Sequence, residues 1–255
     1  MKKKLIAIAA AMTVAMFGVG NAVAQDGVVF IPVDIFACNY NDGQGPDDLD
    51  AVAKKWNEYM DDNESNDYAA WTMTKHYASA DQEFDVAWLG AHKSGTTMGA
   101  GEDQWLAEGG DIAEDFAEVL DCPMAGNYAS RMFKAPPDGN VPENGVLVFS
   151  NCSLKDGARY EDVVAATNEW VAILEEAGSP ASMYHWYPVF GTGEDDIGWK
   201  VITGYPNHAE FGKNYDRMGN GGLYIKSQEL FGDLVDCDIA RVYNIELRRT
   251  AQIRE

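Results

Sequence analysis

Hydrophobic positions in the second half of the chain change period several times. Residues 145–149 form an unbroken apolar run, which predicts a buried strand ending near Cys152. Between residues 160 and 177, apolar residues recur every three or four positions, so a helix is expected there, ended by Gly178. The same criteria predict further strands at 183–190, 199–203 and 240–247, a hairpin turn at 191–195, and helices at 208–218 and 225–235.

The first half of the chain repeats this order. Strands are predicted at 28–38, 69–77, 84–89 and 127–134, and helices at 49–60 and 104–120, the latter with a break at Gly109-Gly110. Residues 135–140 contain two prolines and a glycine and are predicted to link the halves. Each half then reads β-α-β-β-α-β, the order of a ferredoxin-like unit.

Sequence landmarks also repeat between the halves. A tryptophan lies eighteen residues after the first cysteine of each half, the segments Val-Leu-Asp-Cys and Leu-Val-Asp-Cys close them, and a tyrosine lies six residues beyond each closing cysteine. The positions are Cys38, Trp56, Cys122 and Tyr128 in the first half, and Cys152, Trp170, Cys237 and Tyr243 in the second. A repeat of this length predicts a duplicated domain.

The four cysteines allow three disulfide pairings. The repeat selects Cys38 with Cys122 and Cys152 with Cys237, because each pair then belongs to one half. Zinc is the rival interpretation, but no ligands cluster at zinc-site spacing. The sequence therefore predicts two disulfides and no metal site.

The first 24 residues have the features of an export signal. Three lysines precede an apolar stretch over residues 5–19, and Ala22-Val23-Ala24 fits a cleavage site. An uncleaved anchor is the alternative, although the apolar run is short for a membrane span. The predicted organisation is a signal peptide at 1–24, a first unit at 25–135, a linker at 136–144 and a second unit at 145–255, in a periplasmic or secreted protein.

The formal net charge of −22 becomes −25 when the three signal-peptide lysines are removed. Such a surface repels nucleic acid and anionic lipid, so neither nucleic acid nor, after cleavage, a membrane is an expected partner. Solubility explains the charge adequately, and a cationic ligand or partner is the alternative.

Several strands carry more large aromatic residues than one covered sheet face needs. Two such sheets could bury their bare faces against each other, with tryptophans at 71, 88, 186 and 199 between them. This arrangement resembles the dimeric α/β barrel superfamily, here as an intrachain pseudo-dimer of two ferredoxin-like units in an α+β fold. The resemblance implies a monomer, or a homodimer of pseudo-dimers, and relatives that include monooxygenases, haem-degrading oxygenases and chlorite-dismutase-type proteins.

Haem-degrading members of that superfamily carry an asparagine, a tryptophan and a histidine on set elements. The matching positions here are Asn151, Trp199 and His208 in the second half, and Asn39, Trp88 and His92 in the first. The match departs from the pattern, because Trp199 begins its strand, His208 comes early in its helix, and the two asparagines flank their cysteines on opposite sides. Core tryptophans and an ordinary surface histidine are the alternative.

Other motifs are incomplete. The Asp42-Gly43 region resembles a calcium loop but fails the EF-hand spacing, and turn chemistry accounts for it. Residues 90–101 are glycine-rich without a following Gly-Lys-Ser/Thr, so they form no P-loop but could form a surface loop or a lid. His76 and His185 lie at different offsets from the first cysteine of their halves, so an active site would be asymmetric.

The functional expectation is a small apolar or aromatic ligand bound in a cleft between the two units, with no catalytic residue assigned. No cofactor is required by this interpretation, with haem as the alternative. The second hypothesis is a monooxygenase-like or haem-dependent oxidoreductase. The candidate ligand-binding residues are Trp71, His76, Trp88, His185, Trp186, Trp199, His208 and Tyr243.

Overall fold

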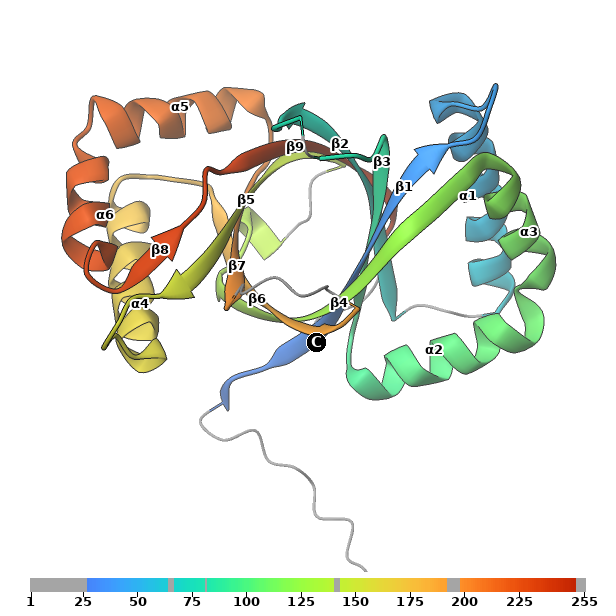
Figure 1. The fold of residues 1–255 in the computed structure, drawn as a ribbon, viewed down its shortest axis with the longest axis horizontal. Helices are drawn as coiled ribbons and strands as arrows, with labels where there is room; N and C mark the ends of the chain where they lie inside the picture. Colours follow the sequence, from blue (N-terminus) through green and yellow to red (C-terminus); the bar gives the residue numbers. More distant parts are fainter. Residues whose placement is uncertain (1–26, 64–66, 81, 140–142, 192–197, 251–255) are drawn as a thin grey trace, which may run out of the picture.

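Nine strands and six α-helices make up the part of the chain that this computed structural model describes, residues 27–63, 67–80, 82–139, 143–191 and 198–250 (Figure 1). The strands are β1 (Phe30–Tyr40), β2 (Tyr68–Tyr77), β3 (Val86–His92), β4 (Leu120–Lys134), β5 (Asn144–Leu154), β6 (Ser182–Phe190), β7 (Trp199–Tyr205), β8 (Val235–Cys237) and β9 (Arg241–Arg249). The helices are α1 (Pro46–Asp62), α2 (Gly95–Glu108), α3 (Gly110–Val119), α4 (Tyr160–Glu176), α5 (His208–Gly219) and α6 (Leu223–Phe231), with a 3-10 turn at Pro137–Gly139. The predicted signal peptide and most of the predicted turn at 191–195 lie outside the described residues.

Eight of the strands form a closed antiparallel barrel. Their order is β7-β6-β4-β1-β3-β2-β9-β5, and β5 pairs back with β7 to close the ring. The short β8 pairs with β5 alone, outside the ring. Figure 1 looks into this barrel, with α1, α2 and α3 on one side and α4, α5 and α6 on the other.

The predicted fold class, two ferredoxin-like β-α-β-β-α-β units forming an intrachain pseudo-dimeric α/β barrel, is wrong. Ladders between β2 and β9 and between β4 and β6 join the two halves of the chain into one barrel instead of two sheets packed face to face. A free strand edge leaves a row of N–H and C=O groups unpaired, and closure of the ring satisfies them. The halves therefore share one hydrogen-bonded wall.

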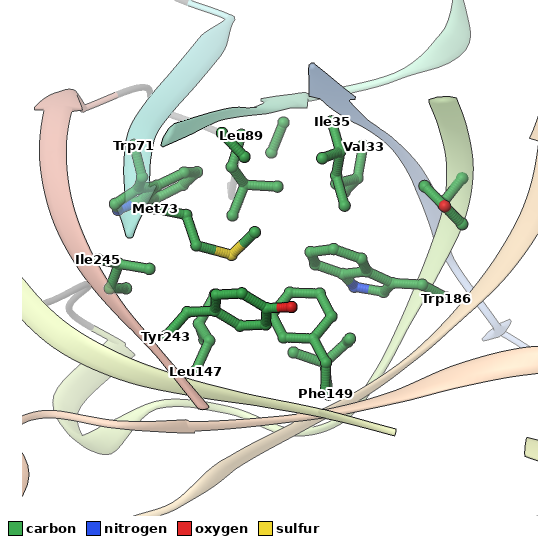
Figure 2. Packing of buried hydrophobic residues seen from close by; sticks show 14 of the residues in the cluster. Val33, Ile35, Trp71, Met73, Leu89, Leu147, Phe149, Trp186, Tyr243 and Ile245 are labelled. Atoms are coloured by element: carbon green, nitrogen blue, oxygen red, sulfur yellow. The ribbon is translucent and has the colours of Figure 1, made fainter. Parts of the chain in front are cut away.

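Apolar side chains fill the middle of the barrel. Alternate residues of each strand point inward, so one side chain in two contributes to this core. Figure 2 shows side chains from several strands converging on the barrel axis. They include Val33, Ile35, Trp71, Met73, Leu89, Leu147, Phe149, Trp186, Tyr243 and Ile245. The space between the halves, where the sequence predicts a ligand cleft, is thus largely occupied by side chains.

Both predicted disulfides are present. Cys38 on β1 joins Cys122 on β4, and Cys152 on β5 joins Cys237 on β8. Each bridge closes a loop of more than eighty residues, with sequence separations of 84 and 85. In the chain-entropy model, a loop of that length contributes about 4–5 kcal/mol to stability.

Two local predictions are corrected. The glycine-rich stretch at 90–101 is not a loop, since it contains the end of β3 and the start of α2, whose first turn is capped by Ser94. The helix predicted at 225–235 ends at Phe231, after which the chain enters β8. No helix among the described residues has the length and apolar character needed to span a membrane.

Candidate functional site

A cavity of about 840 Å³ lies between the barrel wall and the helices α1, α2 and α3. We call it the helix-side cavity. Outward-facing residues of β1 and β3 form its floor, because the residues between them point into the barrel core. Its volume falls within the roughly 300–1,000 Å³ typical of small-molecule sites. Its aromatic lining residues are Phe36, Trp56, Tyr59, Tyr68, Trp88, Trp105 and Phe116.

The covering helix α2 lines the cavity with both small and large side chains, and none of its described residues is buried. Its lining residues are Thr97, Ala100, Gly101, Glu102, Gln104, Trp105 and Leu106. At the end of α2, Gly109 allows a tight turn into α3, because a Cβ there would collide with the Trp105 ring and backbone.

The aromatic walls hold one another through edge-on contacts. The Trp56 ring on α1 lies 5.1 Å from the Trp88 ring on β3, and Trp88 in turn lies 5.5 Å from Phe116 on α3. Tyr59 and Trp105 form a similar pair at 5.7 Å. Such pairs add about 0.5–1.5 kcal/mol each beyond their burial, so the walls keep their shape around the empty space.

One end of the cavity is polar. His92 Nε2 lies 2.7 Å from Asp34 Oδ2, and Asn127 Nδ2 donates to Asp34 Oδ1 at 2.6 Å. The strand register creates this cluster, since Asp34 pairs directly with Asn127 across β1 and β4. The exposed fractions of the histidine and aspartate side chains are 8% and 14%, so the interaction is shielded from water. A histidine oriented by a buried carboxylate is the usual arrangement of a general base.

Tyr68 connects the polar end to the aromatic walls. Its ring lies 4.6 Å from the His92 ring, and its hydroxyl accepts a hydrogen bond from Trp88 Nε1 at 3.2 Å. Burial raises the pKa of Tyr68 well above its usual value, so the hydroxyl stays protonated. Gly90 makes room for this side chain, because a Cβ there would overlap the tyrosine hydroxyl.

The eight predicted ligand-binding residues lie in four separate places. Trp71, Trp186 and Tyr243 belong to the barrel core, and Trp88 lines the helix-side cavity. The His76 and His208 rings lie tilted against each other on the outside, with centroids 4.5 Å apart, and His208 Nε2 lies 2.8 Å from Asn244 Oδ1.

The remaining two, His185 and Trp199, lie together beneath the second helix layer. His185 has an exposed fraction of 1% and its Nδ1 lies 3.0 Å from the Tyr160 hydroxyl. Burial, with a smaller effect of the Arg131 charge, lowers the pKa of His185 to about 3. The Trp199 ring lies 5.9 Å away. This histidine is neutral near pH 7 and sits among aromatic rings in a filled region.

Sequence reasoning missed most of the helix-side cavity. Asp34, Tyr68 and Asn127 were not among the candidates, and His92 was considered only for the haem pattern. One signal was present, since Asp34 interrupts an otherwise apolar strand segment, and a carboxylate in such a position needs a partner.

Comparison with solved structures shows the fold of this chain. No family model matches the sequence, and no curated protein matches it. A mutant chlorite dismutase from Candidatus Nitrospira defluvii superposes with a TM-score of 0.51 at 9% identity, over 85% of this chain and 91% of that one. An anthrone oxidase-like protein superposes with a TM-score of 0.51 at 12% identity, over 89% of this chain and 95% of that one. A candidate monooxygenase from Lactobacillus acidophilus NCFM superposes with a TM-score of 0.51 at 11% identity, over 87% of this chain and 95% of that one. At these identities the likeness shows the fold alone. The closed barrel agrees with the barrel part of the predicted resemblance, whereas its description as two units does not fit.

Several side chains around the cavity that could hold a haem iron already have other contacts, while Tyr59 and Met60 also line it. Haem is commonly held by histidine, cysteine, methionine or tyrosine ligands. His92 already uses Nε2 to contact Asp34, both cysteines on the wall form a disulfide, and the Tyr68 hydroxyl is kept protonated by burial. The second-half haem set is dispersed, because His208 contacts Asn244 on the outside. In the first-half set, Trp88 and His92 both line the helix-side cavity. Within the described ranges, no three metal-ligating side chains cluster.

Proposed function

We propose that the helix-side cavity binds a flat, largely apolar molecule, such as a fused-ring aromatic compound, that carries one hydroxyl or carbonyl group. The observation that carries the proposal is the polar end of an aromatic cavity, where His92 and Asp34 lie 2.7 Å apart. The aromatic walls suit the rings of such a ligand, and the polar end suits its oxygen. Two disulfides support the further proposal that the protein acts outside the cytoplasm.

Charge narrows the ligand class. Asp34, Asp67 and Glu102 line the cavity, while no lysine or arginine does among the described residues. An anionic ligand would therefore meet like charges, so a neutral compound is preferred.

Binding is tested with 2-naphthol and naphthalene as probes, followed by quenching of tryptophan fluorescence. Both should bind the wild-type protein, and Ala113→Leu, which places a larger side chain on the cavity wall, should weaken both at least tenfold. His92→Ala should weaken 2-naphthol and leave naphthalene nearly unchanged. His208→Ala, on the outside of the protein, is the matched control. If Ala113→Leu binds each probe as tightly as the wild-type protein does, this cavity is excluded as the site.

A second candidate function is oxygenation of such a ligand without a cofactor. Two observations favour it: the oriented, shielded His92, and the likeness in fold to an anthrone oxidase-like protein and a candidate monooxygenase. In this scheme His92 takes a proton from an activated ring CH₂ group, the resulting carbanion reduces O₂ to a hydroperoxide, and loss of water leaves a ketone. The balance is one CH₂ group and one O₂ consumed for one C=O group and one water formed.

This candidate is tested with anthrone in an oxygen electrode, where one O₂ should be consumed for each quinone formed. Removal of a positioned base typically costs about 10²–10⁴-fold in rate, so His92→Ala should lose that much kcat. Asp34→Asn should lose activity while naphthalene binding persists, because the ring would lose its orienting carboxylate. Bound anthrone without enzyme-dependent oxygen uptake would reject the oxygenase and leave the binding function standing.

A further inference from the structure

Two of the four histidines are exposed, and they lie against each other on the outside of the barrel. The His76 ring on β2 and the His208 ring at the start of α5 have centroids 4.5 Å apart and planes tilted by 48°. The other two histidines are buried, with exposed fractions of 6% for His92 and 1% for His185. The exposed pair joins the first half of the chain to the second, and it lies outside the helix-side cavity.

The strand β2 is irregular where it carries His76. The residues before and after it pair with Tyr243 and Val242, which are adjacent on β9. Two steps along β2 therefore match one step along β9, and His76 is the extra residue of a β-bulge. A bulge re-aims a side chain relative to the regular alternation of the strand and is common beside functional sites. Here the re-aimed ring is the one that meets His208.

A hydrogen bond fixes the tautomer of His208. Its Nε2 lies 2.8 Å from Asn244 Oδ1, and because an amide oxygen accepts and does not donate, the imidazole donates from Nε2. In the neutral ring, the lone pair is then on Nδ1. Histidines that bind metals usually donate their second ring nitrogen to an oxygen atom in this way, which orients the ring. Asn244 thus holds His208 as such a partner holds a metal ligand.

We propose that His76 and His208 bind one divalent transition-metal ion, such as Zn²⁺, with water completing its coordination. Zinc–imidazole bonds are about 2.0–2.1 Å long, so two nitrogens that share an ion lie within about 4.2 Å of each other. Rings whose centroids are 4.5 Å apart can meet that limit after small rotations of the side chains.

Ligand chemistry gives this site its selectivity. Imidazole suits zinc, copper and nickel, whereas magnesium and calcium take oxygen ligands. The net charge of −22 attracts every cation, so the two histidines are what would distinguish Zn²⁺ from Mg²⁺. Two protein ligands hold an ion more weakly than the four of a structural zinc site, so the bound ion exchanges. This site does not depend on the proposed function.

The probe is Zn²⁺, with Mg²⁺ as its comparison, titrated by calorimetry into the full chain purified without a histidine tag. One Zn²⁺ should bind per chain, and Mg²⁺ should not bind at the same concentrations. Asn244→Ala should weaken Zn²⁺ by about 10–100-fold, and Asn244→Asp, which keeps the acceptor oxygen, should bind as the wild type does. His76→Gln and His208→Gln remove a ligand outright and should weaken Zn²⁺ at least as much. Tyr215→Phe changes an exposed side chain on α5 and is the matched control.

Paramagnetic Ni²⁺ locates the site, because it broadens the NMR signals of nearby groups. The ring signals of His76 and His208 should broaden first, while those of His92 and His185 should stay sharp. His92 is paired with Tyr68, at the opposite end of β2 from His76. Zn²⁺ should also raise the urea midpoint of the wild type and not that of His76→Gln, since an ion that binds only the folded pair stabilises the fold.

Three outcomes would overturn the proposal: no binding of Zn²⁺, equal affinity for Zn²⁺ and Mg²⁺, or unchanged Zn²⁺ affinity in both histidine variants. Broadening of the His92 ring ahead of His76 would place the ion elsewhere and overturn it as well. Binding of 2-naphthol at the helix-side cavity is measured without metal, so it stands or fails separately.

Discussion

The two helix layers cover the same barrel, yet one is hollow and the other is filled. Under α4, α5 and α6, side chains such as Met218, Leu223 and Phe231 pack around Trp170. Under α1, α2 and α3, the equivalent depth is lined by aromatic rings around about 840 Å³. Neither α2 nor α5 brings a buried side chain to its interface. The packing of the second layer therefore depends on α4 and α6, which bury Trp170, Leu174 and Leu223.

The buried histidines of the two helix layers also differ in their surroundings. His92 borders the hollow layer, with Asp34 as its partner. His185 is enclosed in the filled layer, where it contacts the Tyr160 hydroxyl and aromatic rings and lies opposite Arg131 on the neighbouring strand. A buried, neutral histidine of this kind has a packing role, while the other has a carboxylate partner that orients its ring. The two halves therefore differ in the surroundings of their buried histidines, although their disulfides and landmark tryptophans correspond.

The largest expected effect concerns the two disulfides. Replacing either pair of cysteines by serine should lower the free energy of unfolding by about 4–5 kcal/mol in the chain-entropy model, because the closed loops are nearly equal in length. Urea denaturation of the two double variants measures this. Cys38 and Cys122 line the helix-side cavity, so their loss should also weaken naphthalene binding, whereas loss of Cys152 and Cys237 should not. A similar loss of affinity in both variants would contradict the separation of the layers.

The second prediction concerns acid. The folded-state pKa of His185 is about 3, below the ordinary 6.5, so the unfolded chain binds more protons between those values and stability falls as pH is lowered through that window. At pH 4.5 this difference in pKa lowers the free energy of unfolding by about 3 kcal/mol relative to its value at high pH. His185→Phe should flatten the dependence of unfolding free energy on pH between 6.5 and 4.5, and His208→Gln should not. An unchanged slope in His185→Phe would show that other groups cause the acid sensitivity.

Local structure was predictable because it depends on the spacing of apolar residues and on the glycines and prolines that end helices and strands. The helix predicted at 160–177 is α4, and the break at Gly109-Gly110 separates α2 from α3. The repeated landmarks also gave the disulfide pairs. Closure of the barrel was not predictable in the same way, because period-two alternation says which face of a strand is buried and not which strand its edge will meet.

The site was harder to predict than the fold. A cavity is a volume that side chains leave empty, and no residue pattern states that Thr97, Ala100 and Gly101 will face nothing across the gap. The pairing of Asp34 with His92 joins residues 58 positions apart through a three-dimensional register. Aromatic residues were a poor guide on their own, since most of the candidate tryptophans fill cores.

The prediction with the smallest expected effect tests most directly whether the first helix layer is hollow and the second is filled. Ala113 on α3 faces the cavity, while Ala166 on α4 is buried in the packed layer with an exposed fraction of 8%. Adding three heavy atoms at Ala166 should overpack the core, so Ala166→Leu should cost about 1–3 kcal/mol. Ala113→Leu has room to expand and should stay within about 0.5 kcal/mol of wild type, as a substitution outside a packed core does. Both replacements put leucine on a helix, so helix propensity cancels and the difference in urea midpoints reports packing alone. Equal costs would mean that the first layer closes around its cavity in solution, and the hollow would then have no function to explain.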